Sequence, residues 1–89
     1  YREGDFGIRL ENLIVVQEAC GLEGADERPM FDFLTLTYVP IARALICTEM
    51  LSSEERDWLN LYHKACYEVI APRLSPAAKM WLGHATQDI

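Results

Sequence analysis

Hydrophobic and polar residues alternate in two stretches of the first half of the chain, which is the pattern of β-strands. The first stretch covers residues 6–17, FGIRLENLIVVQ, and predicts one long strand. Its early part places apolar side chains on one face and Arg9 and Glu11 together on the other. Its later part, LIVV, is apolar on both faces, so we expect both faces to be covered.

The second alternating stretch covers residues 31–39, FDFLTLTYV, and is rich in β-branched and aromatic residues. We expect Pro40 to end this strand, because proline has no N–H to donate to a ladder. Residues 20–29, CGLEGADERP, contain two glycines, a proline and four charges, which indicates an exposed loop. A loop of about ten residues most simply joins two strands as an antiparallel pair.

A helix is predicted in the second half of the chain, over residues of about 53–71. Ser52 and Glu55 fit the S-x-x-E capping box, and Pro72 ends or kinks the helix. Its apolar stripe, at spacings of three and four, is predicted to contain Trp58, Tyr62, Ala65, Cys66, Val69 and Ile70.

A second helix is predicted over residues of about 76–86, with Ser75 as N-cap and Pro76 at the first helical position. We expect Trp81, like Trp58, to pack in a core or between helices. The segment between the strands and the helices, IARALICTEML, fits neither period. Two strands followed by two helices predict an α+β fold with a short antiparallel sheet. Two strands alone make a marginal sheet, so a piece of the sheet is expected to be missing.

Composition and charge exclude several function classes. The chain has 89 residues, with 51% hydrophobic and 25% charged, which suggests one domain or part of one. A net charge of -6 argues against nucleic acid and against anionic membrane surfaces as partners. No apolar run has the length of a membrane span, and no signal peptide is visible. The chain begins at Tyr1 without methionine, which suggests that its true start is missing.

The cysteines favour free thiols in a reducing cytoplasm. They are Cys20, Cys47 and Cys66, and they are odd in number, widely spaced and without a CxxC pair. A zinc site made from them is therefore disfavoured.

Arg9 and Glu11 are the candidate site residues. On a strand they point the same way, about 6.5–7 Å apart. One interpretation is a surface ion pair, worth about 0–1 kcal/mol. The other is that Glu11 is a metal ligand or general base that Arg9 orients, since hard divalent cations prefer carboxylate oxygens. One glutamate cannot complete a two-metal site, and no other Asp, Glu or His stands in an obvious ligand spacing with it.

Three segments together resemble the aminopeptidase P group of the pita-bread metallopeptidases. Residues 7–12, GIRLEN, are similar to the motif of the last metal-ligand strand in that family. Residues 31–41, FDFLTLTYVPI, resemble the segment that follows it in the longer enzymes. Residues 58–63, WLNLYH, resemble the W-L-N-x-Y-H core of their C-terminal extension. The likeness runs through nearly the whole chain, in the same order.

The resemblance implies the fold and the chemistry of a parent enzyme. Residues 1–40 would be the C-terminal strands of a pita-bread catalytic domain, and residues 41–89 a C-terminal helical extension, in one compact unit. The parent would use two divalent ions, manganese or zinc, to release an N-terminal residue that precedes proline. Glu11 would bridge both ions and Arg9 would support the site, with the other ligands upstream of this chain.

The resemblance also implies the partners and the location. We expect peptide substrates with proline in second position, a homo-oligomer, a cytoplasmic location, and no nucleic acid or membrane partner. The chain alone is expected to be inactive and to bind no metal ion. Its unpaired, apolar strand edge predicts association of the isolated chain through residues 6–17. We expect His63 to be a structural hydrogen-bonding residue and His84 to be exposed.

Two alternatives remain open at this point. The chain could be a non-enzymatic α+β interaction or dimerisation module. Prolidase-type or creatinase-type chemistry is a lesser alternative, because those relatives generally lack the W-L-N-x-Y-H extension.

Overall fold

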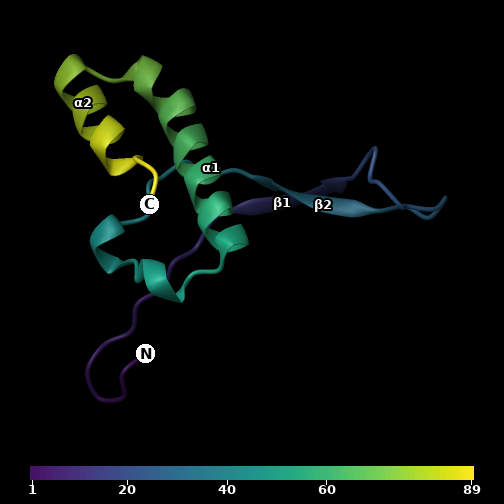
Figure 1. The fold of residues 1–89 in the computed structure, drawn as a ribbon, viewed down its shortest axis with the longest axis horizontal. Helices are drawn as coiled ribbons and strands as arrows, with labels where there is room; N and C mark the ends of the chain where they lie inside the picture. The colour runs from purple at the N-terminus through teal and green to yellow at the C-terminus, as the bar shows by residue number, and fades with distance from the viewer. The chain divides into compact units, whose positions relative to one another are not determined.

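The computed structural model describes residues 1–89, and the chain divides into two compact units, Tyr1–Thr37 and Tyr38–Ile89. Both strands belong to the first unit and all helices to the second (Figure 1). Every buried side chain lies in the second unit.

The first unit contains an antiparallel pair of five-residue strands, β1 (Ile14–Glu18) and β2 (Phe31–Thr35). Val16 pairs with Phe33 at the centre of the register. The loop between the strands is exposed, as predicted. It turns at glycines whose positive φ angles other residues rarely adopt, namely Gly21 at 70° and Gly24 at 76°.

Both strands are shorter than the sequence pattern predicted. The predicted ranges 6–17 and 31–39 are reduced to the parts that pair with each other. Beyond the strands, the main-chain bonding continues by one bond at each end: the Leu36 N–H donates to the Leu13 carbonyl oxygen at 2.8 Å, and the Ala19 N–H donates to the Met30 carbonyl oxygen at 2.9 Å. The remaining residues have no third strand with which to continue a ladder. Pro40 therefore lies beyond the end of β2 and does not itself end the strand.

The predicted helices are confirmed to within one residue at each end. They are α1 (Ser53–Ile70) and α2 (Pro76–Ala85). The capping box of α1 is complete, because Ser52 Oγ accepts the Glu55 N–H at 3.1 Å and Glu55 Oε2 accepts the Ser52 N–H at 2.9 Å. The α+β class with a two-stranded antiparallel sheet and two helices is also confirmed.

Short 3-10 helices form the connections of the second unit. The segment that fitted neither period contains η1 (Arg43–Leu45) and η2 (Thr48–Met50). A third, η3 (Ala71–Arg73), joins α1 to α2, and Ser75 Oγ caps α2 by accepting the Ala78 N–H at 3.4 Å. None of the helices is both long and apolar enough to cross a membrane.

The core of the second unit lies along one face of α1. Leu59, Tyr62 and Cys66 are its buried centre. We call residues 38–51 the connector and residues 86–89 the C-terminal tail. Partly buried residues from both segments pack against this centre, namely Tyr38, Ile41, Ile46, Leu51 and Ile89.

This buried face is rotated from the predicted apolar stripe. Leu59 and His63 are buried, although neither was assigned to the stripe. Trp58 is 52% exposed and Trp81 is 65% exposed, so the prediction that they pack in a core is wrong for this chain. The cause is that the segments before and after the helices cover α1 on the side that carries Asn60, Tyr62 and His63. The side chains of these three residues bond main-chain atoms of the covering segments. Counting the spacing of apolar residues does not detect polar side chains of this kind.

The capping box supports a prediction for the start of α1. Replacing Ser52 with alanine should lower the free energy of unfolding by about 0.5–2 kcal/mol, because the Glu55 N–H loses its acceptor. Ser53→Ala is the matched control, since Ser53 is exposed and follows the cap. Chemical denaturation followed by circular dichroism measures both. Equal losses in the two variants would show that the cap does not stabilise the helix.

The rotated core face supports a second prediction. Leu59→Ala should lower the free energy of unfolding by about 2–5 kcal/mol, because it leaves a cavity among buried side chains. Leu61→Ala should change it by less than about 0.5 kcal/mol, since Leu61 is 67% exposed. Thermal unfolding of the two variants distinguishes the faces. A larger loss for Leu61→Ala would contradict this assignment of the core.

Candidate functional site

Arg9 and Glu11 lie before β1, outside the paired part of the sheet. Arg9 Nε is 3.8 Å from Glu11 Oε1, and both side chains are 69% exposed. The Arg9 guanidinium also donates to the Tyr1 hydroxyl and lies over the Tyr1 ring, 5.5 Å from its centroid. An ion pair this exposed contributes at most about 1 kcal/mol to stability, so its geometry matters more than its energy.

Side chains hold the main chain directly after Glu11. Thr37 Oγ1 accepts the Leu13 N–H at 3.2 Å, and its hydroxyl donates to Asn12 Oδ1 at 3.0 Å. These bonds stand where the strand ladder has ended, next to the bond from Leu36 to Leu13. Thr37 therefore holds the backbone two residues beyond Glu11, at Leu13, and the side chain one residue beyond it, at Asn12.

The chain brings one candidate metal ligand, and no complete metal centre. No group of three or more His, Cys, Asp or Glu side chains is placed to hold a metal ion. The Glu11 carboxylate has the donor chemistry that hard divalent cations prefer, and its exposure leaves it accessible. It fits a metal centre as a single ligand, and the remaining ligands must come from outside these residues.

A second cluster of polar side chains lies on α1 and binds main-chain atoms. Tyr62 Oη accepts the Val39 N–H at 3.1 Å and donates to the Val39 carbonyl oxygen at 2.9 Å. His63 Nε2 accepts the Ile41 N–H at 3.1 Å. The Trp58 ring stacks on Tyr62 with centroids 5.5 Å apart and planes 1° apart. The prediction that His63 is a structural hydrogen-bonding residue is confirmed, and His84 is exposed as expected.

The C-terminal tail is bound in the same manner. Asn60 Oδ1 accepts the Ile89 N–H at 2.9 Å. The Arg43 guanidinium donates to the carbonyl oxygens of Gln87 and Asp88, the latter at 3.2 Å. The polar side chains of the WLNLYH segment therefore form hydrogen bonds to main-chain atoms of the connector and the tail, which is a structural role.

Burial sets the protonation of two groups on this face. Burial lowers the pKa of the His63 imidazole below 6.5, and the positive charge of Arg43 lowers it further. Burial raises the pKa of the Cys66 thiol above 9.0, against a smaller lowering by its hydrogen bond with Tyr62. Both groups are therefore neutral at pH 7, and neither is arranged as a nucleophile or general base.

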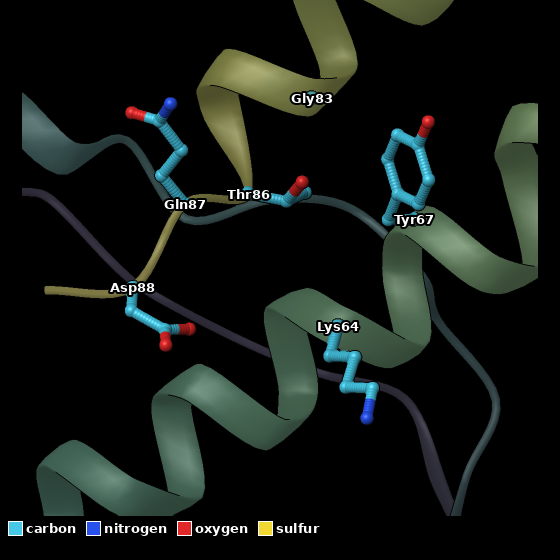
Figure 2. Close-up of a pocket in the computed structure, with 6 residues that line it drawn as sticks. All are labelled: Lys64, Tyr67, Gly83, Thr86, Gln87 and Asp88. Atoms are coloured by element: carbon cyan, nitrogen blue, oxygen red, sulfur yellow. The ribbon is translucent and has the colours of Figure 1, made fainter.

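A pocket of about 290 Å³ lies between α1, α2 and the tail, and is lined by Lys64, Tyr67, Gly83, Thr86, Gln87 and Asp88. Figure 2 shows these side chains spread around an open hollow, with no convergence on one point. The Thr86 hydroxyl is engaged by its own helix, donating to the Leu82 carbonyl oxygen at 2.7 Å. The pocket therefore offers no catalytic arrangement.

Comparison with known proteins identifies the family. Residues 29–89 match the family described as the C-terminal region of peptidase M24, and the chain belongs to this family. Within that class the likeness is to aminopeptidase P. The whole chain is 37% identical to Aminopeptidase P1 of Arabidopsis thaliana and covers 14% of that protein. Over 76% of its length it is 43% identical to a probable Xaa-Pro aminopeptidase P of Tuber melanosporum, covering 11% of that protein.

A solved structure agrees with this assignment. The X-prolyl aminopeptidase of Caenorhabditis elegans matches the whole chain with a TM-score of 0.81 and 31% identity, over 15% of its own length. That protein is described as a cytosolic enzyme with a di-nuclear active site. The resemblance to aminopeptidase P drawn from the three sequence segments is therefore confirmed. The roles of Glu11 and Arg9, and the domain assignment of residues 1–40 and 41–89, remain predictions.

Thr37 was not identified from the sequence, and its contacts support a prediction. Thr37→Val should speed hydrogen exchange of the Leu13 amide, because valine keeps the shape and removes the acceptor. The loss in stability should be about 0.5–1.5 kcal/mol, since the site is partly accessible to water. Thr37→Ser keeps the hydroxyl and is the control. Unchanged exchange at Leu13 in Thr37→Val would contradict the role.

Proposed function

We propose that this chain is the C-terminal part of a dinuclear metal-dependent aminopeptidase that releases an N-terminal residue preceding proline. The observation that carries the proposal is the match of the whole chain, at 31% identity and a TM-score of 0.81, to an X-prolyl aminopeptidase with a di-nuclear active site. The chain spans 14% of the curated relative Aminopeptidase P1, so the activity would belong to the whole protein. Its substrates would be peptides with proline in second position.

Glu11 would be the ligand that this chain contributes to the metal centre, bridging two ions of manganese or zinc. Its place in GIRLEN and its accessible carboxylate support this role. Such ions would polarise a substrate carbonyl and activate water. A carboxylate can bridge them because each of its oxygens can bind one ion. An amide at the same position would be neutral and a poorer bridging ligand.

The surrounding residues would position this carboxylate. Arg9, with its Nε 3.8 Å from Glu11 Oε1, would limit the rotation of the carboxylate. Thr37 would fix the Leu13 main chain and the Asn12 side chain on the other side of Glu11. Position matters for such a ligand, because small misplacements of reacting groups can cost about a hundredfold in rate.

The second unit would be a bracing extension that supplies no reacting group. The buried side chain of His63 accepts the main-chain N–H of Ile41. The cysteines of this unit form no disulfide, and only Cys66 is buried. We further propose that the protein acts in the cytoplasm, which is supported by the cytosolic description of the C. elegans enzyme. We also propose that the whole protein is a homo-oligomer, whereas the large apolar side chains exposed on β1 and β2 support association of the isolated chain.

A substitution at Glu11 tests the metal role. In the full-length protein that contains this chain, Glu11→Gln should lower kcat for Xaa-Pro peptides about a hundredfold or more, because the bridging charge is lost. Bound metal, measured by elemental analysis, should fall below two ions per protein. Glu18→Gln on β1 is the matched control and should leave both unchanged. We expect the 89-residue chain alone to be inactive, and it serves as the reference for loss of activity. Near wild-type turnover in Glu11→Gln would refute the assignment.

A further inference from the structure

Two adjacent side chains on α1 hold one short stretch of the connector. Tyr62 makes two hydrogen bonds to the main chain of Val39, and His63 accepts the N–H of Ile41. His63 is fully buried, at 0% exposure. The Ile41 N–H donates at 3.1 Å to an imidazole nitrogen, so the attachment at this point depends on the protonation state of that ring.

The geometry fixes the tautomer of His63. A nitrogen that accepts an N–H must carry a free lone pair, so Nε2 is unprotonated and the ring proton is on Nδ1. Nδ1 is buried and has no hydrogen-bond partner. Protonation would add a second N–H at Nε2, directed at the N–H of Ile41. Two donors would then face each other, and the bond from Ile41 would be lost.

The groups around His63 do not favour an imidazolium. Arg43, from η1, is positively charged and acts on the ring through its charge. The other titratable side chains of the same core are Cys66 and Tyr62 on α1 and Tyr38 on the connector. The tail carries Asp88, whose main-chain oxygen is bonded to Arg43, and no ion pair joins a carboxylate to His63.

We propose that Tyr62 and His63 form an acid-sensitive clamp, which holds residues 39–41 on α1 while His63 is neutral and releases Ile41 when His63 is protonated. The two bonds between Tyr62 and Val39 do not involve the His63 ring, so they stay in place when that ring is protonated. The release is therefore local, with Val39 as the fixed end and the residues after it as the part that is freed.

The direction of the pH effect follows from linkage. Because burial lowers the pKa of His63 below 6.5 in the folded chain, the unfolded chain binds the proton first as pH falls. The contribution of His63 to stability is complete above about pH 6.5 and is lost as pH falls toward its folded-state pKa. Over that range the unfolding equilibrium constant should rise by up to about tenfold per pH unit.

The chain contains two histidines, which provides a matched comparison. Denaturation of the 89-residue chain is measured between pH 8 and pH 5 for the wild type, His63→Gln and His84→Gln. Glutamine at position 63 can accept the Ile41 N–H and does not titrate. We expect His63→Gln to remove the up to tenfold-per-unit term, while His84→Gln keeps it. An identical pH dependence in wild type and His63→Gln would overturn the proposal.

A spectroscopic measurement on the wild type keeps the proposal testable if His63→Gln fails to fold. Nitrogen NMR of histidine-labelled chain at pH 7.5 should show His63 with its proton on Nδ1. On acidification, hydrogen exchange of the Ile41 amide should accelerate in step with His63 protonation, while that of amides in the middle of α1 should not. A proton on Nε2 at pH 7.5, or an Ile41 amide insensitive to His63 protonation, would overturn the proposal.

Discussion

Irregular main chain can pack against a helix only if its N–H and C=O groups find partners, and this constraint shapes the second unit. Residues 38–42 and 87–89 lie outside helices and strands, so no ladder satisfies them. Side chains of α1 supply the bonds: Tyr62 to Val39, His63 to Ile41, and Asn60 to Ile89. These bonds satisfy the main-chain groups that lie beside the core of Leu59, Tyr62 and Cys66.

The first unit shows the opposite situation. Its two strands pair with each other, but their side chains remain exposed on both faces, including the LIVV segment that the sequence marked for burial. A sheet that is apolar on both faces belongs between other layers. The family match, in which the chain is a small part of its relatives, provides a reason for this exposure. Under the proposed function it also accounts for the lack of other metal-ligating side chains grouped with Glu11 in this chain.

The local signals of the sequence predicted the helices well and the strands poorly. The capping box and the Ser75–Pro76 pair act within one turn of the chain, so they placed both helix starts correctly. Strand length depends on a partner, and alternation alone cannot show where a partner ends. For the same reason the side-chain bond from Thr37 to Leu13 was invisible, because the register between distant segments decides it. The GIRLEN segment was recognised from the sequence because it consists of consecutive residues. Its resemblance to the family motif does not depend on contacts between distant segments.

Asn60, Tyr62, His63 and Arg43 contact main-chain atoms of their partners, and this has an evolutionary consequence. A segment that is bound through its main-chain atoms does not need a particular side chain for those hydrogen bonds. Val39, whose side chain is 66% exposed, can therefore change identity over time, whereas the side chains of Ile41 and Ile89 also pack against the core of α1. Proline is excluded at all three positions, because it would remove the N–H that the helix side chain accepts.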